Sequence, residues 1–217
     1  MSFNTAGSWM PVALSSNLPR LVVMPVWLGG ETVALWRSAS GSISASSDRC
    51  PHRGMRLSHG FVRGEALSCI YHGWSYGQEG RCLKIPAHPG LTPPDTIRVA
   101  TYAVTEQDGI IWAATATSRT PPPRVRGLAP LRSISATASL KAIEAAAGAS
   151  IDASGFLSPQ VEIAGLCLLL SDQGNGETLM HVLVPENASP GDRINASRAA
   201  EVLRRRAEAL AFEGVAA

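Results

Sequence analysis

Four residues in the first third of the chain have the types and the spacing of metal ligands. Cys50 and His52 form a C-x-H pair, and after sixteen intervening residues Cys69 and His72 form a C-x-x-H pair. Thiolate and imidazole ligands suit iron and zinc. Such a set could hold a [2Fe–2S] cluster in which two histidines replace two cysteines on one iron, or a structural zinc ion with four ligands.

The residues around the two pairs favour the iron–sulfur cluster. Zinc knuckles more often use C-x-x-C pairs, and they do not need the Arg-Gly and Gly-Trp dipeptides that follow the pairs here. The motifs CPHRG (residues 50–54) and CIYHGW (residues 69–74) resemble the Rieske domain that opens the oxygenase subunits of Rieske non-haem iron oxygenases. The flanking sequences LSHG (57–60) and GRCLKIP (80–86) are similar to the vanillate-demethylase-type branch. The resemblance spans roughly residues 8 to 115.

This resemblance implies a cofactor and its ligands. It implies a Rieske-type [2Fe–2S] cluster, with Cys50 and Cys69 on one iron and His52 and His72 on the other. Neutral imidazoles lower the negative charge of the cluster, and this raises its potential above that of an all-cysteine cluster.

The same resemblance bears on the reduction potential. Respiratory Rieske proteins carry an extra disulfide at the positions that Met55 and Tyr71 occupy here, and a serine where this chain has Trp74. Tyr76 occupies the matching tyrosine position. Fewer donors to the sulfurs imply a potential toward the low end of the Rieske range of about −150 to +300 mV. Such a potential suits electrons that come from NAD(P)H.

The composition excludes several classes of protein. The 217 residues are 45% hydrophobic and 17% charged, with a net charge of +2, which does not argue for binding to nucleic acid or to an anionic membrane. No apolar run approaches about 20 residues and the first ten residues lack a signal-peptide pattern, so we expect no membrane span and a cytoplasmic location. In a reducing compartment Cys82 and Cys167 are expected to be free thiols.

The first half of the chain is predicted to be mainly β, as an antiparallel barrel or sandwich with inserted cluster-binding loops. We take residues 1–117 as the Rieske domain. Its expected strands cover residues 9–13, 20–27, 31–37, 43–46 (exposed), 97–104 and 110–113, with a hairpin turn at Gly29-Gly30.

The second half is predicted to be a small α+β domain. A proline-rich linker over residues 118–130 separates it from the first, so the second domain covers residues 131–217. Its expected elements are a helix over 139–147, a hairpin of strands 161–170 and 178–185, and a helix from Ser189 onward. The expected apolar face of this last helix over 198–212 consists of Ala199, Val202, Leu203, Ala207, Leu210 and Phe212. A hairpin followed by a long helix resembles the end of the helix-grip catalytic domain of Rieske oxygenases, in a shortened form.

The histidine count bears on catalysis. The chain has 5 histidines, of which only His181 lies beyond the first domain, and no HxxxH or HxxxxH pair occurs. Because a mononuclear iron site needs two histidines and a carboxylate, we expect no catalytic residues of this kind and no oxygen activation by this chain alone. His59 and His88 lie inside the first domain, and His181 is interpreted as a strand histidine that faces solvent or is satisfied by a hydrogen bond.

The predicted function is therefore electron transfer within an oxygenase complex. The chain would be the [2Fe–2S] subunit of a hetero-oligomeric Rieske-type oxygenase. Its partners would be an NAD(P)H-dependent reductase or ferredoxin and a catalytic subunit that carries the mononuclear non-haem iron. A stand-alone Rieske ferredoxin and a structural subunit of such a complex are the alternatives.

Overall fold

The computed structural model describes residues 9–116, 120–159 and 166–214. The chain divides into two compact units. Of the described residues, the first contains 9–106, 111–116 and 120–121, and the second contains 107–110, 122–159 and 166–214. Each unit has its own hydrophobic core.

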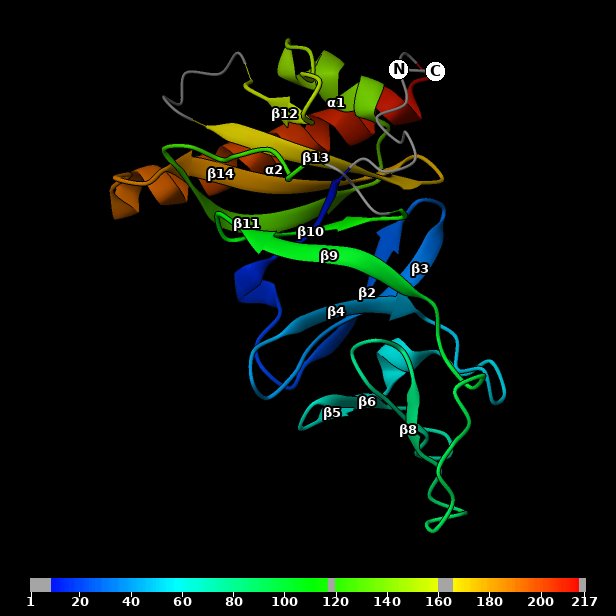
Figure 1. Ribbon diagram of the computed structural model, residues 1–217. Helices are drawn as coiled ribbons and strands as arrows, with labels where there is room; N and C mark the ends of the chain where they lie inside the picture. The colour runs from blue at the N-terminus through cyan, green and yellow to red at the C-terminus, as the bar shows by residue number, and fades with distance from the viewer. Residues whose placement is uncertain (1–8, 117–119, 160–165, 215–217) are drawn as a thin grey trace. The chain divides into compact units, whose positions relative to one another are not determined.

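The larger sheet of the N-terminal unit is an antiparallel, nearly closed barrel (Figure 1). Its order is β1-β10-β9-β4-β3-β2, and β1 also contacts β2. The strands are β1 (Met10–Leu14), β2 (Val23–Leu28), β3 (Glu31–Arg37), β4 (Ile43–Ser47), β9 (Thr101–Gln107) and β10 (Ile110–Ala114), with a short 3-10 turn η1 (Ser15–Asn17) after β1. Apolar residues fill the interior, and the predicted mainly-β class is confirmed.

A smaller sheet carries the loops that contain the candidate ligands. It consists of β5 (Phe61–Arg63), β6 (Ala66–Ser68), β7 (Ser75–Tyr76) and β8 (Cys82–Lys84), preceded by the 3-10 turn η2 (Leu57–His59). Its buried side chains form a second core with Ala34 and Trp36 of β3. This core includes Cys50 and Cys69, so the first residue of each ligand loop is anchored in the interior.

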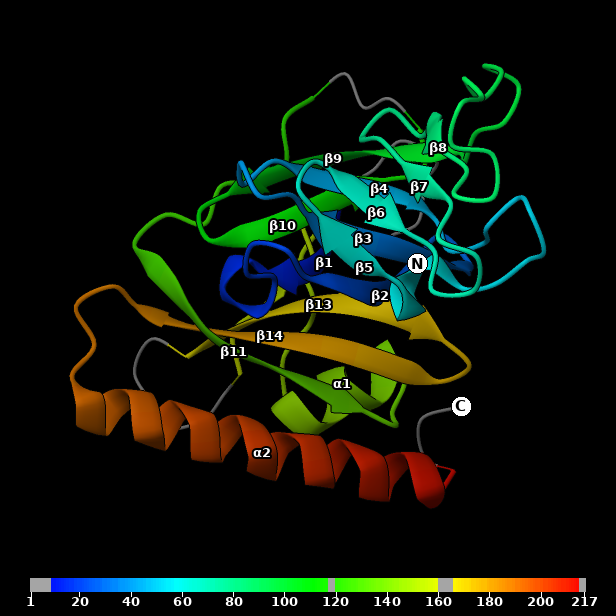
Figure 2. The same cartoon turned by 90° about the horizontal axis from the view of Figure 1, so that it is seen from below.

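The C-terminal unit is a four-stranded antiparallel sheet with two helices on one face (Figure 2). The sheet order is β11-β14-β13-β12, from β11 (Leu128–Ala136), β14 (Glu177–Pro185), β13 (Cys167–Gly174) and β12 (Phe156–Leu157). The helices are α1 (Leu140–Ala147) and α2 (Pro190–Phe212). No helix in the described part of the chain is long and apolar enough to cross a membrane.

The helix ends follow local sequence rules. The Ser139 side chain caps the start of α1, and Gly148, with φ of 64°, ends it. At the start of α2, Ser189 and Asp192 form a reciprocal capping box with Pro190 at the first helical position. Both helices therefore begin at the serines that the sequence indicated.

Three strand predictions in the N-terminal unit need correction. β2 begins at Val23 and not at residue 20, because Leu21 lies in a turn with a φ of 65°. β9 begins at Thr101 and not at residue 97, because residues 97–100 leave the barrel to contact the small sheet. There the amide of Cys82 donates to the Ile97 carbonyl and that of Val99 donates to Gly80. The strand over 43–46 is buried and not exposed, since Ser44, Ala45 and Ser46 lie inside the barrel wall. The alternation of apolar residues and serines there had suggested an exposed strand.

The buried face of α2 also differs from the prediction. Val202 and Phe212 were expected in the apolar face, but their side chains are 66% and 94% exposed. The buried stripe consists of Ala196, Ala200, Leu203 and Ala207, of which Leu203 and Ala207 were predicted. The predicted Ala199 and Leu210 are partly buried against the same core. Alanine allows close approach of the helix to the sheet. The predicted strand over 161–170 lies partly outside the described residues, and its described part belongs to β13.

Candidate metal centre

The two ligand loops have the same backbone arrangement. In the first, the amide of Cys50 donates to the Met55 carbonyl (2.8 Å) and that of Gly54 donates to Cys50 (2.8 Å). In the second, the amide of Cys69 donates to Trp74 (2.9 Å) and that of Gly73 donates to Cys69 (3.0 Å). Each loop thus turns back on its own cysteine.

A glycine four residues after each cysteine makes this turn possible. Gly54 and Gly73 have φ of 70° and 71°, values in the left-handed region that residues with a Cβ rarely adopt. The glycines of the two motifs are therefore required by the backbone of the loops.

The two thiols lie together in the interior. Cys50 and Cys69 are each 2% exposed, and both belong to the same buried core. Burial raises the pKa of Cys69, and backbone hydrogen bonds from Tyr71 and His72 partly oppose this effect. In the metal-free chain this thiol is protonated at neutral pH, so metal binding would release a proton.

Tyr76 adds a hydroxyl to the thiol pair. Its Oη lies 3.1 Å from the Cys50 Sγ, and its side chain is buried. Burial and the nearby Cys50 side chain raise the Tyr76 pKa far above its ordinary value, so the hydroxyl keeps its proton and can donate it to a thiolate. The sequence had placed Tyr76 at the matching tyrosine position.

The two imidazoles lie toward the surface. The ring centroids of His52 and His72 are 4.7 Å apart in an edge-on arrangement, with His52 partly buried and His72 exposed. Desolvation, the neighbouring His72 and Arg53 all lower the pKa of His52. The neutral form that binds metal is thereby favoured.

Aromatic rings contact both imidazoles. The Trp74 indole stacks on the His52 ring with centroids 4.3 Å apart and planes 5° from parallel. The Tyr71 ring lies tilted against His72, with centroids 3.9 Å apart. Trp74 had been interpreted from the sequence only by the hydroxyl that it lacks, and its contact with His52 was missed.

A buried carboxylate closes the first ligand loop. Asp48 is 2% exposed, and its two oxygens accept from the amide (2.6 Å) and the hydroxyl (2.8 Å) of Ser58. Arg56 lies 3.8 Å from the same carboxylate. These two hydrogen bonds between Asp48 and Ser58, which we call the Asp48–Ser58 clip, join the two ends of the loop that carries Cys50 and His52. The motif residues were visible in the sequence, but their pairing was not.

The other cysteines and histidines lie elsewhere. Cys82 and Cys167 are buried free thiols, and Cys82 belongs to the core around the thiol pair. His59 and His88 are exposed. His181 is fully buried in β14, where its Nδ1 lies 2.8 Å from the Ser133 hydroxyl of β11.

The donor set fits a binuclear cluster. Two buried soft thiols form one pair and two imidazoles near the surface form the other, which matches the division of ligands between the two irons of a Rieske centre. In the described residues, no group of three or more His, Cys, Asp or Glu side chains is placed to hold one metal ion.

Comparison with known proteins agrees with this geometry. Residues 8–103 match the Rieske [2Fe-2S] domain family. Oxidoreductase NdmD of Pseudomonas putida is 45% identical over 105 residues, which cover 48% of this chain and 18% of that protein. A 4beta-methylsterol monooxygenase of Methylococcus capsulatus is 42% identical over 106 residues, which cover 48% of this chain and 29% of that protein. The match thus spans less than a third of each of these relatives.

The fold is also similar to that of solved structures. Apo dicamba monooxygenase aligns with a TM-score of 0.74 at 16% identity, over 96% of this chain and 86% of that chain. NdmA of Pseudomonas putida CBB5 aligns with a TM-score of 0.71 at 17% identity, over 94% and 80% of the two chains. The likeness in fold therefore extends beyond the first half of the chain.

These findings define the class of the N-terminal unit. Residues 8–103 are a Rieske [2Fe-2S] domain, and the cofactor of this domain is a Rieske-type [2Fe–2S] cluster. The relatives that match this part of the chain include an oxidoreductase and a monooxygenase.

Proposed function

We propose that this chain is the electron-transfer subunit of a Rieske-type non-haem iron oxygenase. In this proposal Cys50 and Cys69 hold one iron of the cluster, and His52 and His72 hold the other. The observation that carries the proposal is the separation of a buried thiol pair from an imidazole pair that reaches the surface.

The chain's own residues would support a one-electron centre in distinct ways. When bound, the cluster supplies reversible one-electron chemistry. Tyr76 donates a hydrogen bond to the Cys50 sulfur and stabilises negative charge there. Trp74 holds the orientation of His52 and covers one face of its ring. Burial of the thiols excludes water from the sulfur side, while His72 at the surface gives a short path to a partner.

The proposed partners are a reductase or ferredoxin that depends on NAD(P)H and a catalytic subunit with a mononuclear iron. The similar proteins NdmA and NdmD are separate chains, and we propose that this chain belongs to a hetero-oligomeric system in the cytoplasm. We propose that the unit built on β11 to β14 is a separate domain that assembles with the catalytic subunit. Its own core of apolar residues supports this division.

The test combines metal analysis with one ligand variant. The purified chain should contain two irons, with visible bands that bleach on addition of dithionite. His72→Ala should remove the Rieske signal and electron transfer while the C-terminal unit stays folded. His59→Ala, which changes an exposed histidine of η2, is the matched control and should keep the signal. A colourless protein with one zinc would refute the proposal. A third iron would show that this chain has a mononuclear iron site of its own, contrary to the proposal.

A further inference from the structure

The surface around the two imidazoles has properties of its own. It is formed by three segments, residues 49–59, 69–75 and 83–91, which we call the imidazole-end surface. We propose that this surface docks a redox partner protein whose contact face has an apolar centre and an acidic rim. The inference rests on the proposed function and adds the chemistry of the partner.

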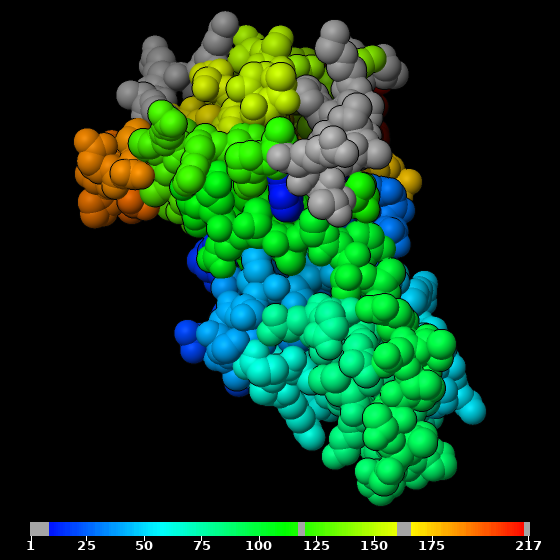
Figure 3. All heavy atoms as spheres, viewed as in Figure 1, coloured from blue at the N-terminus to red at the C-terminus, as the bar shows by residue number. Residues whose placement is uncertain are grey.

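Backbone contacts bring the second and third segments together. Ser75 of β7 pairs with Lys84 of β8, and a Cβ placed on Gly73 would lie 3.0 Å from Pro86. The segment after β8 therefore runs beside the loop that carries Cys69 and His72. Figure 3 shows this segment, in green, projecting from the surface of the N-terminal unit.

The imidazole-end surface is unusually apolar. Of the eight large hydrophobic side chains exposed in the described residues, four belong to it. They are Ile70 (58% exposed), Tyr71 (54%), Leu83 (49%) and Leu91 (52%). Ile70 and Tyr71 lie between the ligands Cys69 and His72, so these apolar groups are next to the exposed imidazole. Exposed apolar side chains gathered in this way are typical of a protein contact surface.

The charges of the same segments have one sign. Arg49, Arg53 and Lys84 are exposed, and the described residues place no carboxylate within ion-pair distance of them. The sequence of the three segments contains no aspartate or glutamate. The neighbouring Asp48 is buried in its clip with Ser58.

This combination selects the partner by charge. A patch of uncompensated cations raises the rate of encounter with an acidic surface at low ionic strength and repels a basic one. The apolar side chains then bury area once the two proteins meet, next to the histidines where the electron leaves. A partner protein with acidic residues around an apolar patch is the complement of this surface.

Two redox proteins of opposite charge serve as probes. Plastocyanin is an acidic copper protein with an apolar patch, and mitochondrial cytochrome c is a basic haem protein. The full chain is reduced with dithionite, freed of excess reagent and mixed with either oxidised probe in a stopped-flow instrument. One electron passes from the reduced cluster to Cu(II), giving Cu(I), or to Fe(III) haem, giving Fe(II), and no atom is transferred. The second-order rate is measured at low and high salt.

The variants separate local charge from net charge. Arg53→Glu and Lys84→Glu each change the net charge by two, as does the control Arg20→Glu. Arg20 contacts the turn around Gly41, at the opposite end of β4 from the first ligand loop. With plastocyanin at low salt we expect the first two variants to slow transfer by about tenfold or more and the control by about twofold or less. High salt should lower the rate of electron transfer from the wild type to plastocyanin, and it should lower the rate of Arg53→Glu less.

A second pair of variants tests the apolar centre. Ile70→Ser should slow transfer to plastocyanin by several-fold at every salt concentration, while Val202→Ser, which changes an exposed residue of α2, should not. The proposed surface would be overturned if Arg53→Glu and Arg20→Glu lowered the rate of electron transfer to plastocyanin equally. It would also be overturned if the wild type transferred electrons faster to cytochrome c than to plastocyanin at low salt. Absence of bleachable bands in the wild type would instead refute the proposed function, so the two failures are distinguishable.

Discussion

The indole ring of Trp74 lies flat against the imidazole ring of His52, with centroids 4.3 Å apart and planes 5° from parallel. The two residues come from different ligand loops, so the stack joins the C-x-H loop to the C-x-x-H loop. By the family resemblance, the position of Trp74 holds a serine in respiratory Rieske proteins. In this chain an aromatic surface replaces a hydroxyl donor, and the orientation of one proposed ligand is fixed by packing.

The first prediction concerns this stack. Trp74→Leu removes the aromatic contact, which we expect to contribute about 0.5–1.5 kcal/mol. Since about 1.4 kcal/mol corresponds to a tenfold change in an equilibrium constant, the cluster should be retained about 2- to 10-fold less well. The measurement is the loss of visible absorbance in the presence of an iron chelator. Trp74→Phe keeps an aromatic face and should recover most of the retention. Equal retention in Trp74→Leu and the wild type would show that the stack is incidental.

The second prediction concerns the hydroxyl of Tyr76. Tyr76→Phe removes the donor that lies 3.1 Å from the Cys50 sulfur. A hydrogen bond to a charged group stabilises the more negative, reduced cluster by about 1 kcal/mol more than the oxidised one, so its loss should lower the potential by about 40 mV. A spectroelectrochemical titration measures this shift.

Tyr102→Phe is the matched control for Tyr76→Phe. The Tyr102 hydroxyl donates to Glu31 (2.7 Å) on the barrel and does not contact the thiol pair. This variant should leave the potential within a few millivolts of the wild type, since the group removed lies outside the core around the thiols. Similar shifts in both tyrosine variants would show that the change is not specific to the Cys50 contact.

The backbone of the two candidate ligand loops follows from the sequence more directly than the packing around them. The ligand loops are short, and each depends on a cysteine and a glycine four residues later, so the motif contains most of the information that the backbone needs. The clip between Asp48 and Ser58 and the stack of Trp74 on His52 join residues that a linear pattern does not pair. These contacts depend on how the loops pack against each other.

The second half was predicted in outline but not in its packing. Ser139, Gly148 and Ser189 mark helix ends by local hydrogen bonding, which a sequence records directly. The apolar pattern correctly placed Leu203 and Ala207 in the buried stripe of α2, but it also included the exposed Val202 and Phe212. His181 was interpreted as solvated or satisfied by a hydrogen bond, and the structure places it in the interior with Ser133.

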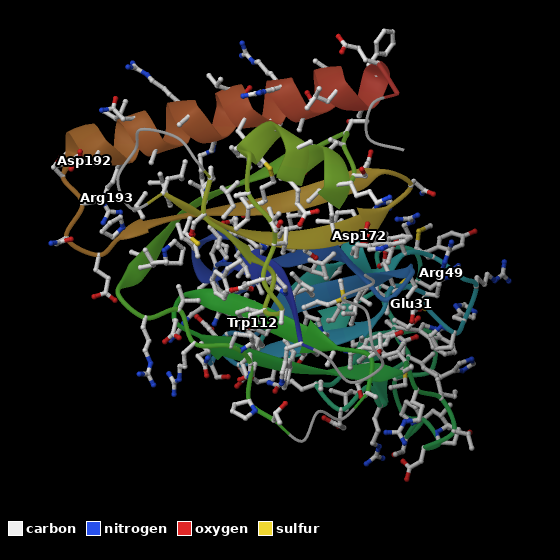
Figure 4. All side chains as sticks on the ribbon, turned by 90° about the horizontal axis from the view of Figure 1, so that it is seen from above. Glu31, Arg49, Trp112, Asp172, Asp192 and Arg193 are labelled. Atoms are coloured by element: carbon white, nitrogen blue, oxygen red, sulfur yellow. The ribbon has the colours of Figure 1, made fainter. Side chains whose placement is uncertain are left out.

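The last prediction concerns pH and the capping box of α2, where Asp192 lies in the first turn (Figure 4). Hydrogen bonds from the side chain and the amide of Ser189 lower the pKa of Asp192 below its ordinary value of 3.8. A carboxylate with a lowered pKa contributes stability that is present above its ordinary pKa and is lost as the pH falls through the lowered value. Thermal unfolding of the C-terminal unit, followed by circular dichroism, should therefore shift to lower temperature below about pH 4. In Asp192→Asn this part of the pH dependence should disappear.

Two further variants locate this effect at the N-terminal end of the helix. Ser189→Ala should lower the free energy of unfolding by about 1 kcal/mol at neutral pH, because the cap is lost at any pH. Glu213→Gln changes an acidic residue at the opposite end of α2, where the helix dipole disfavours negative charge, and it should not lower stability. If Asp192→Asn keeps the full acid-induced shift of the wild type, carboxylates other than the capping box are responsible for it.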